Sequence, residues 1–151
     1  MMHYFDYTYN EWHLRIEEED GFIISIVRDP HPKSEGNETT LIRRCFDEIV
    51  DYFECKRKVF SVPFKYDGTP FMLEVFDLVC AIPYGETRSY RWVAEQMGRP
   101  RSYRAVGTAC SKSNLFLLVP MHRVISSQGI GGYGGEIDVK RWLLNHEFSV
   151  L

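Results

Sequence analysis

The chain has 151 residues, a net charge of −3 and a hydrophobic fraction of 44%, which is enough apolar material for one domain or two small lobes. It contains no apolar run near the roughly 20 residues of a membrane-spanning helix, and its first residues do not resemble a signal peptide. These features exclude a membrane-embedded class. We therefore expect a globular protein of the cytosol or nucleus with no membrane partner.

The first part of the chain predicts a small sheet followed by a helix. Aromatic and branched residues at close spacing from His3 to Val27 predict short strands, and Asn10 and Asp20-Gly21 predict the turns between them. Residues 29–40 read as a loop. Apolar residues then recur at helical spacing from Leu41 to Phe53, which predicts one amphipathic helix.

The pattern breaks again between residues 63 and 70, where Pro63, Asp67-Gly68 and Pro70 mark the best candidate for a linker. We therefore predict two lobes, comprising residues 1–65 and 66–151.

The second lobe is predicted to be helical. A first helix, from Phe71 to Cys80, is followed by one that begins after Ser89 and ends before Gly98, and by another that begins after Ser102. Such an arrangement is typical of a helix-turn-helix, although two short helices joined by a glycine turn also occur in ordinary helical domains.

One side of the last of these helices carries mostly small residues, which would let its backbone approach a partner closely. The residues on this side are Arg104, Gly107, Thr108 and Ser111.

The charge is distributed unevenly along the chain. Residues 1–54 hold 13 acidic and 5 basic side chains, whereas residues 86–124 hold 7 basic and 2 acidic ones, a local charge of 7 − 2 = +5. This basic segment is either a phosphate-contacting surface or an ordinary solvated helix face.

The four cysteines, Cys45, Cys55, Cys80 and Cys110, form no Cys-x-x-Cys pair and no cluster with metal-ligand spacing. We expect reduced thiols, no metal and no disulfide framework. No phosphate-binding glycine loop is present either, so we expect no cofactor.

Several uncommon motifs, in register over residues 51–147, closely resemble the O6-alkylguanine-DNA alkyltransferase family. They are Asp51-Tyr52-Phe53-Glu54, Ile82-Pro83-Tyr84-Gly85-Glu86-Thr87, Ser89-Tyr90, Arg104-Ala105-Val106-Gly107, Pro120-Met121-His122-Arg123-Val124-Ile125, Gly131-Gly132-Tyr133-Gly134-Gly135 and Lys140-Arg141-Trp142-Leu143-Leu144-Asn145-His146-Glu147. The resemblance implies an α+β fold, in which a small sheet-plus-helix (ribonuclease H-like) lobe precedes a helical lobe with a winged helix-turn-helix that binds DNA.

The family resemblance further implies that the helix-turn-helix enters the minor groove of duplex DNA and that an O6-alkylated guanine is flipped into a pocket, a step that costs a few kcal/mol. By this correspondence Arg104 fills the gap left in the base stack, and Tyr90 helps to turn the nucleotide and hydrogen-bonds the guanine. The other residues expected to contact DNA are Ser89, Ala105, Gly107, Thr108, Ser111 and Arg123.

The family's reaction transfers the alkyl group to a cysteine thiolate in a Pro-Cys-His-Arg motif, and here that cysteine position is Met121. His122 and Glu147 stand where the family has the histidine and glutamate that favour the thiolate, and Asn114 matches the asparagine that orders the active-site turn. Met121 resembles an alkylated cysteine with one additional methylene, because a thioether has no proton to lose.

The resemblance places Cys110, Met121, Gly132, Tyr133 and Gly134 around the lesion. Gly134 replaces a serine that is often found after the pocket tyrosine, so recognition of the lesion would depend more on backbone groups. Cys110 falls where relatives often carry a methionine, and it is either a slow alkyl acceptor or a small buried thiol.

Three hypotheses follow. The favoured one is an alkyltransferase-like protein, a monomeric sensor in the nucleoid or nucleus that binds O6-alkylguanine in double-stranded DNA and marks it for nucleotide excision repair. The second is a methylated-DNA–protein-cysteine methyltransferase that acts through Cys110, or whose native cysteine Met121 has replaced. The third is a general DNA-binding module.

Overall fold

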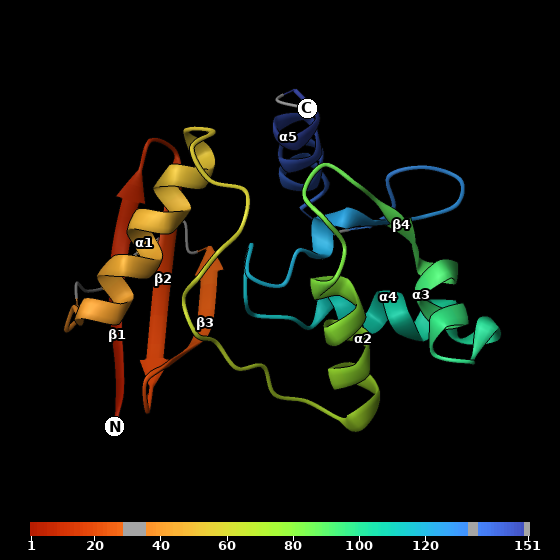
Figure 1. Cartoon of the computed structure of the whole chain (residues 1–151), viewed down its shortest axis with the longest axis horizontal. Coiled ribbons are helices and arrows are strands. Elements are labelled where there is room, and N and C mark those ends of the chain that lie inside the picture. The colour runs from red at the N-terminus through yellow and green to blue at the C-terminus, as the bar shows by residue number, and fades with distance from the viewer. Residues whose placement is uncertain (29–35, 133–135, 150–151) are drawn as a thin grey trace. The chain divides into compact units, whose positions relative to one another are not determined.

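The computed structural model describes residues 1–28, 36–132 and 136–149, which form two compact units (Figure 1). Unit 1 comprises Met1–Tyr66 together with Asn114–Leu118, and unit 2 comprises Asp67–Ser113 together with Val119–Leu151. A small antiparallel sheet in the first unit and short helices in the second confirm the predicted α+β class.

The sheet of unit 1 has three strands in the order β1-β2-β3, all antiparallel. The strands are β1 (Met2–Tyr9), β2 (Trp12–Glu19) and β3 (Phe22–Arg28). The predicted turns lie between them, with positive φ at Asn10 (52°), Asp20 (52°) and Gly21 (83°). Residues that tolerate positive φ favour the tight turns that connect twisted antiparallel strands.

Helix α1 (Thr40–Phe53) packs its apolar face on this sheet. Thr39 caps the helix, because its side chain accepts a hydrogen bond from the Ile42 N–H at 3.1 Å. Phe46 of the helix stacks on Tyr7 of β1 at a ring-centroid distance of 4.0 Å. The predicted amphipathic helix is therefore confirmed, and its buried face forms the core of unit 1 with the inward-facing side of the sheet.

The short segment Asn114–Leu118 returns to unit 1 and covers the edge of β3. The Ile26 N–H donates to the Asn114 carbonyl at 2.7 Å, the Phe116 N–H donates to the Ile26 carbonyl at 3.1 Å, and Leu115 is fully buried. The linear division into residues 1–65 and 66–151 did not anticipate this return. The unpaired backbone groups of an edge strand are satisfied here by a distant segment.

Among the described residues, unit 2 is built from four α-helices, two 3₁₀ turns and a small two-stranded sheet. They are α2 (Pro70–Cys80), β4 (Arg88–Ser89), α3 (Tyr90–Gln96), η1 (Pro100–Ser102), α4 (Tyr103–Ser111), η2 (Met121–Arg123), β5 (Val124–Ile125) and α5 (Ile137–Phe148). Strands β4 and β5 pair in parallel. Helices of this length are too short to cross a bilayer, and none within the described ranges qualifies.

Helices α3 and α4 form the predicted helix-turn-helix. Gly98 ends α3 with φ of 71°, and the Ser89 side chain caps its start. Ser102 differs from its predicted role, because it ends the 3₁₀ turn η1 and its side chain makes no capping hydrogen bond. Pro100, placed at the start of η1, preorganises the turn that leads into α4 instead.

Candidate functional site

A buried polar cluster connects the start of η2 to the end of α5. The Nε2 atom of His122 lies 2.5 Å from Oε2 of Glu147, and the Gly85 N–H donates to Oε1 of the same carboxylate at 3.1 Å. His122 is 1% exposed and Glu147 is fully buried. Sequence predicted that these two residues belong to one site, and the structure brings them into direct contact.

The charges in this cluster follow from burial and hydrogen bonding. Burial alone would raise the pKa of Glu147, but hydrogen bonds from His122 and Arg123 outweigh it and hold that pKa well below its usual range. Burial lowers the pKa of His122 despite the opposing effect of Glu147. The pair is therefore a carboxylate and a neutral imidazole at neutral pH.

A neutral imidazole that donates from Nε2 to Glu147 presents Nδ1 as an acceptor. Among the described residues, none hydrogen-bonds the buried Nδ1 of His122. The cluster therefore holds a base, next to residue 121 in the chain, whose accepting atom has no hydrogen-bond partner within residues 1–28, 36–132 and 136–149.

Arg123 does not take the predicted DNA-contacting position. Its Nε and Nη2 atoms donate to the two oxygens of Glu147 at 2.9 and 3.0 Å, and its Nη1 atom donates to the Ile82 carbonyl at 2.8 Å. Arg123 is only 7% exposed. The prediction that it contacts DNA is wrong, because its guanidinium is buried and neutralises Glu147.

Met121 opens η2 and is half-buried. Its N–H donates to the Val119 carbonyl at 2.8 Å, which ties the residue into the turn that precedes His122. The nucleophile position of the family motif is therefore ordered, although it carries a thioether.

Lys140, which the sequence reasoning missed as a site residue, is fully buried beside Tyr90. Its Nζ atom donates to the carbonyls of Val124 at 2.6 Å and Gly132 at 3.0 Å and to the Tyr90 hydroxyl at 3.3 Å. Burial lowers the pKa of Lys140 to about 8. A signal was present in the sequence, because Lys140 shares its helical spacing with the buried Leu143, Leu144 and Glu147.

Cys110 is 6% exposed, at the end of α4. Burial raises the pKa of its thiol to about 12, although the nearby Lys140 charge opposes the shift. A thiol with such a pKa is protonated at neutral pH and is a poor nucleophile. The structure therefore favours the small buried thiol over the slow alkyl acceptor.

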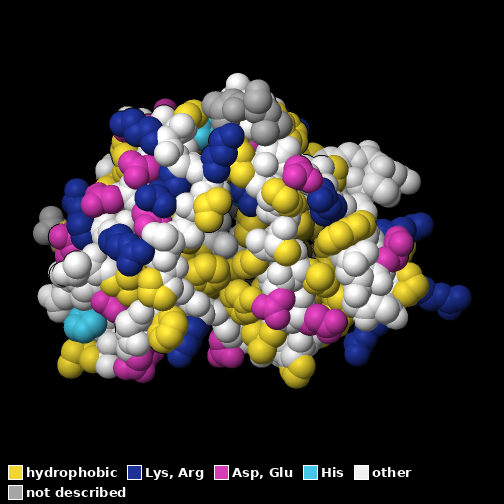
Figure 2. All heavy atoms as spheres, in the orientation of Figure 1, with side chains coloured by type: hydrophobic (Ala, Val, Ile, Leu, Met, Phe, Trp, Pro, Cys, Tyr) yellow, Lys and Arg dark blue, Asp and Glu magenta, His cyan; other side chains and the backbone are white. Residues whose placement is uncertain are grey.

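The outer side of α4 is exposed at Arg104, Ala105, Thr108 and Ser111, and half-buried at Gly107. The hydroxyls of Thr108 and Ser111 donate to backbone carbonyls of their own helix, at 3.2 and 2.6 Å. Basic side chains also stand out at the end of unit 2 where α3 and α4 lie (Figure 2). The exposed ones are Arg91, Arg99, Arg101, Arg104 and Lys112.

Ser89, which was predicted to contact DNA, has a structural task in this arrangement. Its hydroxyl oxygen accepts from the Trp92 N–H at 2.9 Å and caps α3. We expect Ser89→Ala to lower the free energy of unfolding by about 1 kcal/mol, the usual cost of losing such a cap. Chemical denaturation would measure this, with the exposed Ser127→Ala as the matched control. Equal stabilities of the two variants would contradict the capping role.

One predicted site residue lies in unit 1, and two others lie outside the described residues. Asn114 belongs to unit 1, where its carbonyl accepts from Ile26, so its predicted role in ordering the turn at Met121 stays a prediction. Tyr133 and Gly134 lie outside the described residues.

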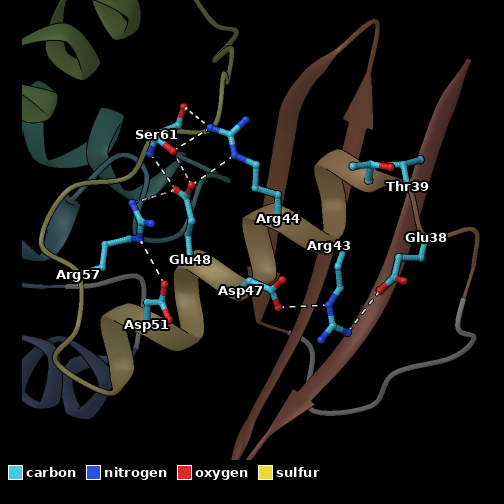
Figure 3. A pocket seen from close by; sticks show the side chains of 10 residues that line it. Glu38, Thr39, Arg43, Arg44, Asp47, Glu48, Asp51, Arg57 and Ser61 are labelled. Carbon is cyan, nitrogen blue, oxygen red and sulfur yellow. Dashed lines mark hydrogen bonds and ion pairs between the residues drawn. The ribbon is translucent and has the colours of Figure 1, made fainter.

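Unit 1 contains a surface hollow of about 700 Å³ along α1 (Figure 3). Its three guanidinium groups all face carboxylates, with Arg43 at 3.2 Å from Asp47, Arg44 at 3.5 Å from Glu48, and Arg57 at 3.7 Å from Asp51. Such mutual neutralisation does not suit the binding of an anion, and we assign no ligand to this hollow.

The fold and site define a class of α+β protein with a helix-turn-helix unit and a buried His–Glu–Arg cluster. Residues 70–149 match the family described as 6-O-methylguanine DNA methyltransferase, DNA binding domain. The chain belongs to this family.

Relatives support the assignment over different lengths. The inducible methylated-DNA–protein-cysteine methyltransferase of Bacillus subtilis (strain 168) is 45% identical over 101 residues, which are 66% of this chain but only 56% of that protein. The crystal structure of Mycobacterium tuberculosis O6-methylguanine methyltransferase has a TM-score of 0.88 at 32% identity and covers 99% of this chain and 94% of its own. A structure of M. tuberculosis OGT in complex with DNA has a TM-score of 0.83 at 32% identity, with coverage of 97% and 92%.

Proposed function

We propose that this protein binds duplex DNA, holds O6-alkylguanine in a pocket near Met121, and does not transfer the alkyl group to residue 121. The protein would act as a monomeric damage sensor that marks the lesion for other repair proteins, such as those of nucleotide excision repair. The observation that carries this proposal is a thioether at the nucleophile position beside an otherwise intact His122–Glu147 pair.

The chemistry at residue 121 supports the absence of transfer. In the family reaction a thiolate displaces guanine from the alkyl carbon, and the anionic sulfur is what makes the displacement feasible. The sulfur of Met121 already carries two carbon substituents and has no proton that His122 could remove. Attack by this sulfur on the alkyl carbon would form a positively charged sulfonium ion. The buried His122–Glu147 cluster does not favour this step, because there is no proton for it to remove.

The surface of unit 2 supports DNA binding. Small residues on α4 allow close approach of its backbone, and the surrounding arginines supply the charge that phosphates require. A relative with 32% identity has been solved in complex with DNA. In the proposed complex, Arg104 replaces the flipped nucleotide in the stack, and Tyr90 contacts the base.

Relatives named as methyltransferases favour a second candidate, transfer to another cysteine of this chain. Cys110 is the candidate acceptor, but a pKa of about 12 keeps its thiol protonated. A third candidate, binding of DNA without lesion preference, differs from the proposal only in the affinity ratio between damaged and undamaged duplex.

We expect no change in the intact mass of the protein after incubation with duplex DNA containing O6-methylguanine. In a parallel binding assay, the damaged duplex should bind more tightly than the same duplex with guanine. A gain of one methyl group that peptide mapping places on a cysteine would overturn the proposal in favour of the second candidate. An affinity ratio near one would favour the third.

A further inference from the structure

Arg91 is an exposed cation of unit 2 whose side chain has a defined position. It is the second residue of α3, and the central carbon of its guanidinium lies 5.4 Å from the ring centroid of Tyr103, the first residue of α4. Glu95 follows one turn later on α3, at the spacing of a helical ion pair, but Arg91 lies over the ring and forms no ion pair with it. A cation–π contact therefore joins the two helices of the helix-turn-helix.

A neighbouring arginine shows what distinguishes Arg91. Arg88 lies over the Trp92 ring at 5.5 Å, but its Nη2 atom donates to Oε1 of Glu86 at 2.9 Å and its Nη1 atom donates to the Thr87 carbonyl at 2.8 Å. Arg91 has no such acceptor within residues 1–28, 36–132 and 136–149. Its guanidinium is therefore oriented by a ring while its N–H donors are available to a ligand.

The chemistry of this position favours a phosphate. A guanidinium that stacks through its face keeps its donors in the plane of the group, where they match two oxygens of one phosphate. Other exposed cations nearby in the sequence, Arg101, Arg104 and Lys112, likewise form no ion pair with a described carboxylate. Several unneutralised cations along one segment suit a ligand with repeated negative charges, such as the backbone of duplex DNA, better than a single carboxylate.

We propose that Arg91 contacts a DNA phosphate from α3 and that Tyr103 is the positioning residue that holds its guanidinium for this contact. This inference rests on the proposed function and deepens it, because it adds a contact from α3 to those expected of α4. A phosphate contact carries no information about the base. Arg91 therefore contributes equally to the binding of damaged and undamaged duplex, and Tyr103 reduces the entropy lost when this long side chain is ordered.

The first test measures the affinity of the full chain and of Arg91→Met for duplex DNA at several salt concentrations. Each neutralised phosphate contributes about 0.9 to the slope of the logarithm of affinity against the logarithm of salt concentration. Arg91→Met should bind about tenfold more weakly at about 0.05 M salt and about threefold more weakly at about 0.2 M. The loss should be the same for O6-methylguanine duplex and guanine duplex, so the affinity ratio between them should not change.

Arg43→Met is the matched control for the loss of an exposed arginine. Arg43 of unit 1 also lies over an aromatic ring, that of Phe46 at 5.8 Å, but its Nε atom faces Oδ1 of Asp47 at 3.2 Å. Because this guanidinium is neutralised within the protein, Arg43→Met should keep both the affinity and the salt slope of the unmodified protein. An equal loss of slope in the two variants would overturn the assignment of a phosphate to Arg91.

A double-mutant cycle tests the role of Tyr103. Tyr103→Leu removes the ring and should weaken binding about threefold, as expected for the loss of an exposed cation–π contact, whereas Tyr103→Phe keeps the ring and should keep the affinity. In the Arg91→Met background, Tyr103→Leu should cause no further loss. A loss that persists in that background, or an equal loss in Tyr103→Phe, would overturn the positioning role, because Tyr103 would then act through the fold or through its own hydroxyl.

The outcomes distinguish this inference from the proposed function. Failure of the unmodified protein to bind either duplex, or an affinity ratio near one between the two, contradicts the proposed function itself. Tight binding of the damaged duplex with a salt slope that Arg91→Met leaves unchanged contradicts the role of Arg91 alone.

Discussion

Replacing Met121 with cysteine is expected to give the protein the ability to remove a methyl group from O6-methylguanine in duplex DNA. The expected change is from no detectable transfer to one methyl group per protein molecule. No other single substitution should have so large an effect, because it supplies the acceptor that the rest of the site lacks.

The physical reason lies in the state of the neighbouring groups. His122 is neutral, its Nε2 atom is held by Glu147 at 2.5 Å, and its buried Nδ1 atom has no hydrogen-bond partner among the described residues. A thiol at position 121 would find a base in the correct protonation state to accept its proton, and the imidazolium that forms would be stabilised by the Glu147 carboxylate. The thiolate could then form the bond to the methyl carbon while the carbon–oxygen bond to guanine breaks.

Intact mass spectrometry after a single incubation measures the transfer, and peptide mapping should place the methyl group on residue 121. Met121→Ser is the matched control, because a serine hydroxyl stays protonated where a thiol can ionise, and it should give no transfer. If Met121→Cys binds the damaged duplex but gains no mass, then the His122–Glu147 pair is not competent to activate a thiol, and its retention is structural.

Glu147→Gln should destabilise the fold more than any other single-residue change in unit 2, by about 3–5 kcal/mol, as when a buried ion pair loses one partner. Glu147 is fully buried and accepts hydrogen bonds from His122, Arg123 and the Gly85 N–H. The neutral amide would leave the Arg123 guanidinium buried without its counter-charge. Denaturant unfolding of the variant should show a midpoint far below that of the exposed control Glu95→Gln.

The same carboxylate predicts an acid response. Its pKa is lower in the folded protein than in the unfolded chain, so its contribution to stability is present above the unfolded value of about 4.3 and declines as the pH falls further. His122, whose pKa is also lowered, loses its contribution in the same direction as the pH falls. Unmodified protein should therefore lose more stability than Glu147→Gln between neutral and acid pH. Parallel losses in both proteins would contradict the pairing of Glu147 with its two partners.

Much of the local structure could be predicted from residue types and spacing. The turns at Asn10 and Asp20-Gly21, the amphipathic helix α1 and the Ser89 cap all follow from preferences that act over a few residues. The family motifs identified His122 and Glu147 as members of one site, and Met121 as the residue that differs from the family pattern. Each of these features depends on residues that are contiguous or regularly spaced in the sequence.

Other features depended on partners that are distant in the chain. From the sequence, Arg123 was expected on the surface. In the structure its guanidinium is buried, because it hydrogen-bonds Glu147, 24 residues away. Lys140 likewise meets Tyr90, 50 positions away, and the segment Asn114–Leu118 returns to pair with Ile26. Sequence alone determined which local elements form and that position 121 carries no thiol. Only the tertiary structure decided which charged side chains are buried and which atoms they hydrogen-bond. The reason is that the free-energy cost of burying a charge depends on the atoms that folding brings around it.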